Sequence, residues 1–163
     1  MKRISKTALA GILCALAVVI MVVGSLFAKI DIATAVFSSV CIMLILNEAG
    51  YKYAIGAYLA VSIISFLIVP SKTPVALFLA FFGYYPILKQ YTEQRFRRPV
   101  AYVLKYIVLN MAIAVLFVIA NTMFAKIPLP VITIVFIGTN LVLPIFDIAL
   151  GIMMSFYYSR IRK

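Results

Sequence analysis

Long apolar runs separated by short polar segments fill the chain from its beginning to its end. A helix needs about 20 mostly apolar residues to cross the hydrocarbon core of a bilayer. Six runs approach this length, and we expect helices over residues 7–27, 32–46, 53–69, 75–88, 100–124 and 131–158. The pattern predicts an all-α integral membrane protein, a six-transmembrane-helix bundle that forms one transmembrane domain over residues 1–163.

The basic residues divide unevenly between the two sides of this predicted bundle. With the N-terminus in the cytoplasm, twelve of the fifteen Lys and Arg residues lie on the cytoplasmic side. Only Lys29, Lys72 and Lys126 lie outside. Basic residues concentrate in the cytoplasmic loops of membrane proteins. We therefore expect both termini in the cytoplasm and the chain in the plasma membrane. The net charge of +11 then reflects topology rather than nucleic-acid binding.

The composition excludes several classes of protein. Hydrophobic residues make up 66% of the chain and charged residues 12%, against about 45–50% and about 25% in soluble domains. There is no His and there are only four acidic residues, so His-based metal sites, Ser-His-Asp triads and paired carboxylates are not expected. The sequence also contains no GxxxxGK[ST] phosphate loop. We expect no enzymatic activity, no metal and no cofactor.

One acidic residue must lie inside the hydrocarbon. Asp147 stands about eleven residues from the inner end of the last predicted helix, where an unpaired carboxylate costs a few kcal/mol, about 2.5–3.5 on insertion scales. Lys105 lies at a comparable depth in the preceding helix, and we predict an ion pair between the two. The pair could serve as a structural link, as an element of coupling to a partner, or in direct substrate or proton binding.

Small residues recur at four-residue spacing on the first predicted helix, as Ala10-xxx-Cys14 and Gly11-xxx-Ala15. Such spacing lets the backbones of two membrane helices approach closely. Two interpretations remain open, namely packing inside the bundle and docking on a partner membrane protein.

Lysines are expected around an opening on the outer side. These are Lys29, Lys72 and Lys126, and Asp31, Asn121, Thr122, Thr139 and Asn140 are candidate hydrogen-bonding groups near or below them. The set predicts binding of an anionic small molecule. The alternative is that the lysines only extend to the membrane interface.

The segment from Lys89 to Pro99 carries four basic residues and one acid. We expect a cytoplasmic loop that contacts anionic lipid, or else a docking surface for a partner.

Three stretches resemble the substrate-binding S component of energy-coupling factor (ECF) transporters, as found in Firmicutes. They are Thr7–Ala17 (TALAGILCALA), Phe81–Lys89 (FFGYYPILK) and Phe146–Gly151 (FDIALG), the last followed by Arg160-Ile-Arg162. The resemblance implies a six-helix subunit that captures a vitamin or metal ion from outside. It also implies a membrane coupling subunit and two cytosolic ATPases as partners. The absence of His argues against the nickel and cobalt type.

In this family an AxxxA-type patch on the first helix contacts the coupling subunit. The matching positions are Gly11 and Ala15, or Ala10 and Cys14, and neither pair is Ala-Ala. The predicted function is therefore capture of a small, vitamin-like, possibly anionic metabolite for an ECF-type importer. Two alternatives stay open: a non-transport scaffold of envelope assembly resembling MreD, and a small stand-alone channel or carrier.

Overall fold

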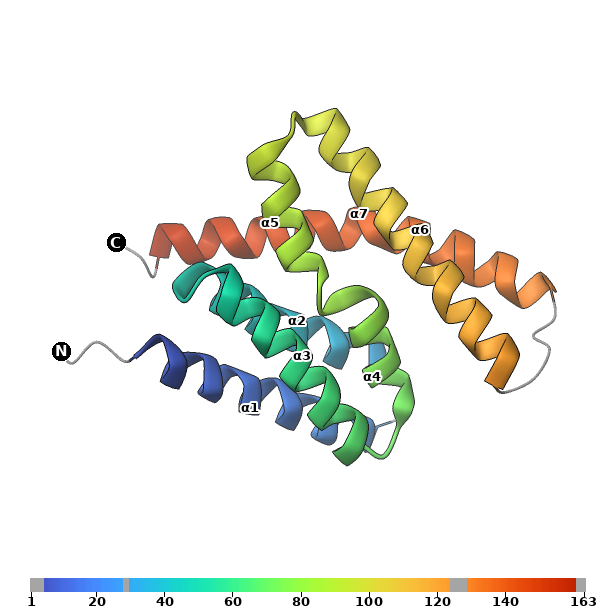
Figure 1. The fold of residues 1–163 in the computed structure, drawn as a ribbon, viewed down its shortest axis with the longest axis horizontal. Helices are drawn as coiled ribbons and strands as arrows, with labels where there is room; N and C mark the ends of the chain where they lie inside the picture. Colours follow the sequence, from blue (N-terminus) through green and yellow to red (C-terminus); the bar gives the residue numbers. More distant parts are fainter. Residues whose placement is uncertain (1–4, 28–29, 124–128, 161–163) are drawn as a thin grey trace. The chain divides into compact units, whose positions relative to one another are not determined.

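The computed structural model describes residues 5–27, 30–123 and 129–160. Its elements are α1 (Lys6–Ser25), α2 (Asp31–Glu48), α3 (Tyr51–Ile68), α4 (Lys72–Leu77), the π-helical turn η1 (Phe78–Phe82), α5 (Tyr85–Arg95), α6 (Arg98–Met123) and α7 (Leu129–Arg160) (Figure 1). The described residues contain no strand. The predicted all-α fold class is therefore confirmed, and the six predicted runs correspond to α1, α2, α3, the broken segment α4–η1–α5, α6 and α7.

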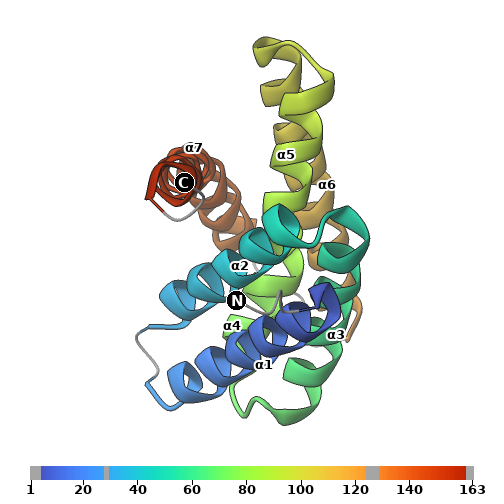
Figure 2. The ribbon, with the colours of Figure 1, turned by 90° about the vertical axis from the view of Figure 1, so that its left-hand side faces the viewer.

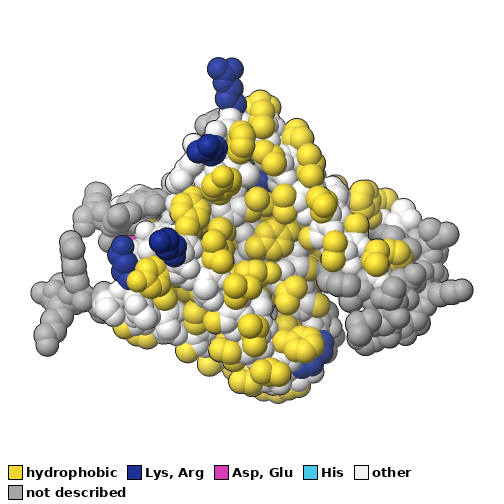
Figure 3. Space-filling view, viewed as in Figure 1, with side chains coloured by type: hydrophobic (Ala, Val, Ile, Leu, Met, Phe, Trp, Pro, Cys, Tyr) yellow, Lys and Arg dark blue, Asp and Glu magenta, His cyan; other side chains and the backbone are white. Residues whose placement is uncertain are grey.

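Four of the described helices are long and apolar enough to cross a membrane. They are α1, α2, α3 and the segment Phe136–Tyr157 of α7, while α6 contains a shorter apolar stretch, Pro99–Val115. The face in Figure 3 is covered mainly by apolar side chains, with few Lys and Arg among them. A surface of this kind is suited to lipid, and the helices together indicate a membrane protein.

The fourth predicted helix differs from the expectation of one continuous span over 75–88. The helix widens into the π-helical turn η1, where the Gly83 amide donates to the Phe78 carbonyl, five residues earlier, at 2.7 Å. Pro86 then lacks the N–H that would continue the helix to Phe82, and it occupies instead the first turn of a new helix. That helix, α5, continues to Arg95, so most of the segment expected as a loop over 89–99 is helical.

The chain divides into two compact units, Met1–Arg95 and Phe96–Lys163. In the first unit α2 is the central helix, and it contacts α1, α3, α4, η1 and α5. Figures 1 and 2 show α1 beside α2 and α3. Half of the α2 span is buried, against 22% of the α1 span and 28% of the α3 span. The core of this unit therefore surrounds α2.

Two local signals set the ends of α3. Gly50, between α2 and α3, has φ +98°, a left-handed backbone conformation that favours glycine because it lacks a Cβ. At the other end Val69 is extended, as expected of a residue that precedes a proline, here Pro70. These two positions confine α3 to Tyr51–Ile68.

The second unit consists of α6 and α7, which cross obliquely (Figure 1). Their buried apolar side chains include Leu109 on α6 and Leu143 and Leu150 on α7. Pro144 lies inside α7, which nonetheless runs unbroken from Leu129 to Arg160. A proline inside a membrane helix is tolerated where neighbouring groups satisfy the released carbonyl.

Candidate functional site

A buried ion pair connects α6 and α7 in the second unit. Lys105 Nζ is 3.0 Å from Asp147 Oδ1, and the two side chains are 1% and 4% exposed. Lys105 comes from the first third of α6 and Asp147 from the second half of α7, so the bond joins the two helices of the unit. Each charge compensates the other, which is what ionised groups at membrane depth require.

An aromatic ring adds to the lysine side of this pair. The ammonium of Lys105 lies 5.0 Å from the centre of the Tyr102 ring, within the range of a cation–π interaction. The two residues are three apart on α6, so they lie on neighbouring positions of the helix surface. Tyr102 thus connects the buried ion pair to the exposed surface of α6.

A second polar contact joins α6 and α7 further along. The side-chain amides of Asn110 and Asn140 exchange hydrogen bonds at 3.1 and 3.4 Å. The contact lies five residues after Lys105 on α6 and seven before Asp147 on α7, as expected of helices that run in opposite directions. Each amide also donates to a carbonyl of its own helix, that of Tyr106 or Phe136. Among the described residues, at least two polar contacts therefore join α6 and α7, at different positions along the helices.

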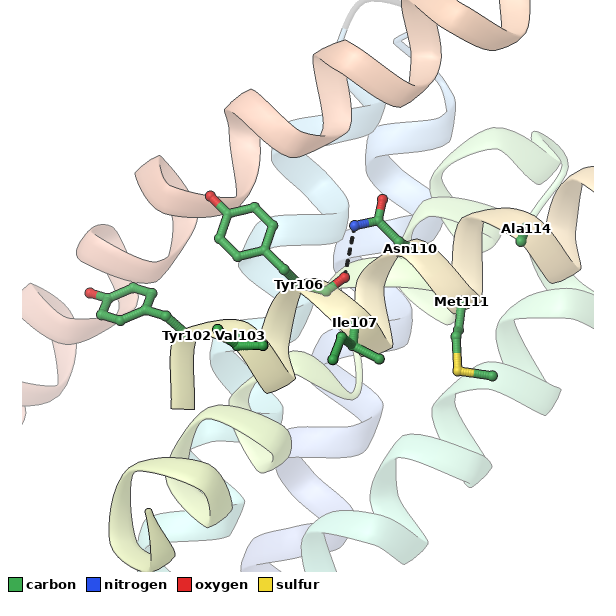
Figure 4. Close-up of a pocket in the computed structure, with 7 residues that line it drawn as sticks. All are labelled: Tyr102, Val103, Tyr106, Ile107, Asn110, Met111 and Ala114. Atoms are coloured by element: carbon green, nitrogen blue, oxygen red, sulfur yellow. Dashed lines mark hydrogen bonds between the residues drawn. The ribbon is translucent and has the colours of Figure 1, made fainter. Parts of the chain in front are cut away.

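A groove runs along the surface of α6, between two rows of its side chains. Its lining residues form two adjacent rows at four-residue spacing, Tyr102, Tyr106, Asn110 and Ala114 beside Val103, Ile107 and Met111 (Figure 4). The groove has a volume of about 780 Å³ and is open along its length. Side chains at i and i+4 form ridges on a helix, and the space between two ridges is a groove. The walls are almost entirely apolar, apart from the Asn110 amide and the two phenol groups.

The small residues of α1 separate into two faces. Ala10 is buried and Cys14 half-buried, whereas Gly11 and Ala15 are exposed. A Cβ atom added at Gly11 would have no atom within 4 Å. The structure therefore assigns Ala10 and Cys14 to packing inside the first unit and leaves Gly11 and Ala15 as the small exposed pair.

The residues predicted to surround an outer opening are described only in part. Lys29 and Lys126 lie outside the described residues, and Asn121 and Thr122 are in the last turn of α6, where only the backbone is described. Thr139 and Asn140 are half-buried on α7, and Asn140 pairs with Asn110. Asp31 is the first residue of α2, and its buried Oδ1 has no hydrogen-bond partner among the described residues.

Lys72 has a local structural role. Its ammonium donates to the carbonyls of Phe66 and Val69 at 2.6 and 2.9 Å and lies 5.3 Å from the centre of the Phe66 ring. The last carbonyls of a helix have no partner within the helix, and a lysine side chain can satisfy them. The Lys72 side chain therefore caps the C-terminal end of α3.

Three features of these sites were not anticipated from the sequence. The sequence did not identify Asn110 as a site residue, although it is a polar residue within an apolar stretch and lies a little more than one turn from Lys105. The cation–π contact of Tyr102 and the groove along α6 were also missed. The four-residue spacing of Tyr102, Tyr106 and Asn110 could have suggested a common face, but spacing alone does not tell which face a neighbouring helix covers.

Comparison with protein-family models, with curated proteins and with solved structures found no match. Any inference about function therefore rests on the residues themselves. What they offer is a small exposed face on α1, a buried ion pair with an amide pair, and an apolar groove on α6.

Proposed function

We propose that this chain is the substrate-capture subunit of an ECF-type importer in a bacterial plasma membrane. In this proposal both termini are cytoplasmic, and the chain binds a small, vitamin-like and possibly anionic metabolite from the outer side. It performs no catalysis itself. Transport depends on a membrane coupling subunit and on two cytosolic ATPases, because the sequence contains no phosphate loop of its own.

The observation that best supports this proposal is the exposed Gly11 and Ala15 pair on α1. Helices in lipid associate mainly where small residues let their backbones approach, since lipid tails are as apolar as leucine. Within α1 the inward small residues already pack against the first unit, while Gly11 has open space at its Cβ position. This face is thus available for a second membrane protein, and it coincides with the docking position that the family resemblance implies.

The distribution of charge supports the proposed topology. The basic residues at the two chain ends, together with Arg95, Arg97 and Arg98, would face the cytoplasm. Labelling of single cysteines added at each end of a cysteine-free variant should find both ends inside. An outer C-terminus would contradict the topology.

For the ligand site, we propose that Lys29 and Lys126 attract the anionic group, with Asp31, Asn121, Thr122 and Thr139 as hydrogen-bonding candidates. Because Lys72 is engaged at the end of α3, it is the weakest member of the predicted set. Replacing Lys29 and Lys126 together by Gln should weaken capture of the metabolite. Unchanged affinity would leave these lysines as interfacial side chains.

Affinity purification from native membranes in a mild detergent, followed by mass spectrometry, tests the proposal. We expect a coupling subunit and ABC-type ATPases to co-purify with the wild-type chain. Ala15→Leu should abolish this recovery, because a bulky side chain prevents close backbone approach. Ala33→Leu, at an exposed position of α2, is the matched control and should retain the partners. Recovery of envelope-synthesis proteins in place of a coupling subunit, or of no partner, would overturn the proposal.

A further inference from the structure

We propose that the groove along α6 binds one anionic glycerophospholipid, with an acyl chain between the two rows of side chains and the phosphate at Arg97. This site is separate from the proposed capture of a metabolite, and it does not depend on it.

The length of the groove matches one leaflet of a bilayer. From Tyr102 to Ala114 the helix rises about 18 Å, at about 1.5 Å per residue. Half of the hydrocarbon core of a bilayer measures about 15 Å. The lining is mostly apolar over this length, and its exposed members include Val103, Ile107 and Met111. An extended acyl chain is therefore the ligand whose length and chemistry fit the groove.

The charge at one end of the groove favours an anionic headgroup. Arg97 directly precedes α6 and is exposed, and Arg98 is the first residue of the helix, about one turn before Tyr102. The sequence has no acidic residue between Glu93 and Asp147, and Asp147 already pairs with Lys105. A lipid phosphate at Arg97 would therefore meet no competing carboxylate from the second unit. Basic residues beside a membrane helix attract anionic headgroups in this way.

The side chains that line the groove argue against a second helix as its occupant. Helix pairs in membranes use small residues at their contact, so that the backbones can approach. Here the described lining consists mostly of large side chains, and Ala114 is the one small residue among them. Large ridges hold two helix backbones apart, whereas a thin and flexible acyl chain can lie between them. The interaction of Lys105 with the Tyr102 ring also holds one end of the groove in place.

Native mass spectrometry of the full chain in detergent micelles tests this proposal, with phosphatidylglycerol and phosphatidylcholine of identical acyl chains as probes. We expect one phosphatidylglycerol to bind the wild-type chain about fivefold or more tightly than phosphatidylcholine, as one arginine beside a membrane surface would provide. Arg97→Gln should remove most of this preference, because it should weaken the binding of phosphatidylglycerol, which has a net negative charge, more than that of zwitterionic phosphatidylcholine. Ala114→Trp should weaken both lipids, because the indole fills the end of the groove.

Two matched variants separate this site from general lipid adhesion. Lys52→Gln removes another exposed charge, and Ala149→Trp adds an indole to an exposed position of α7. Neither should change the binding of either lipid.

Equal binding of the two lipids by the wild-type chain would overturn the proposal. So would a loss of phosphatidylglycerol binding with Lys52→Gln that equals the loss with Arg97→Gln. A dimer that Ala114→Trp dissociates would also overturn it, because a second copy would then occupy the groove. Should Ala114→Trp fail to fold, Met111→Ala, which shortens one wall, must weaken both lipids or the groove is not the site.

Discussion

The two units of this protein hold their helices together by different means. Between α1 and α2 in the first unit, Gly24 lies so close to Thr34 that a Cβ on the glycine would overlap the threonine side chain. Nearby the Ser38 hydroxyl donates to the Ala17 carbonyl at 3.0 Å. Between α6 and α7 in the second unit, the contact depends on an ion pair and on an amide pair.

Because of this difference, substitutions should reduce the stability of the two contacts in different ways. A contact built on close approach weakens in proportion to the atoms displaced, because each atom pair contributes only about 0.1–0.2 kcal/mol. A buried ion pair depends on both partners, because removing one leaves an uncompensated charge in a medium that solvates it poorly. We infer that the first unit tolerates substitution gradually, whereas the second unit is sensitive at a few positions.

The largest effect is expected from Lys105→Ala. The substitution leaves the buried Asp147 carboxylate without its main countercharge, and we expect a loss of about 3–5 kcal/mol in the free energy of unfolding. Titration of the purified protein with sodium dodecyl sulfate in mixed micelles, followed by circular dichroism, measures this loss.

A second substitution tests the cause of that loss. Asp147→Asn removes the charge and should recover part of the stability when it is combined with Lys105→Ala. Additive losses in the double variant would exclude the ion pair as the cause. Lys52→Ala, at an exposed lysine of α3, serves as the control and should change little.

The next effect in size is expected in the first unit, from Gly24→Leu. The new side chain must displace Thr34 and separate α1 from α2, and overpacking of this kind costs about 1–3 kcal/mol. The same titration measures the loss. Gly11→Leu is the matched control on the same helix, because nothing lies within 4 Å of its Cβ position. It should be neutral or should raise stability by less than about 1 kcal/mol, since glycine is a poor helix former. Equal effects of the two variants would refute the close approach at Gly24.

The sequence allowed the helices to be predicted well wherever one physical signal acted alone. Apolar length located α1, α2 and α3 to within a few residues, and Pro70 marked the end of α3. The fourth span was mispredicted because two signals conflicted. Apolar residues continued past Gly83, while Pro86 prevented the helix from continuing. The polar composition of residues 89–99 then indicated a loop, although α5 continues to Arg95 and contacts α2 and α3.

The hydrogen-bond or ion-pair partner of a polar group could be predicted only where its charge restricted the possible partners to a few residues. Asp147 needed a cation at its own depth, and Lys105 was the available one, so the pair followed from the sequence. Asn140 could be satisfied by many groups, and its partner Asn110 depends on the register of two helices, which periodicity does not fix. The orientation of Gly11 away from the bundle, and of Ala10 into it, depends likewise on how α1 is rotated about its own axis.

The amide pair should contribute less than the ion pair beside it. We expect Asn110→Ala and Asn140→Ala each to destabilise the protein, with a coupling energy of about 0.6 kcal/mol and at most about 1.7. The coupling is small because a neutral amide without its partner is far cheaper to bury than a charge, and each amide keeps a bond to its own helix. A double-mutant cycle in the same detergent titration gives the value. A coupling energy near zero would mean that the two amides act independently.

The smallest effect is expected from Lys72→Met, which removes an exposed polar contact in the first unit. The ammonium satisfies two carbonyls at the end of α3, but water and lipid headgroups can replace it there, so its contribution should be about 0.5 kcal/mol. Local opening of the last turn of α3 should then become about twofold more frequent, which hydrogen exchange of the amides over 65–69 would detect. Lys52→Met, at the opposite end of the same helix, should leave that exchange unchanged. A loss of global stability comparable to that of Lys105→Ala would contradict the comparison, because an exposed charge would then matter as much as a buried one.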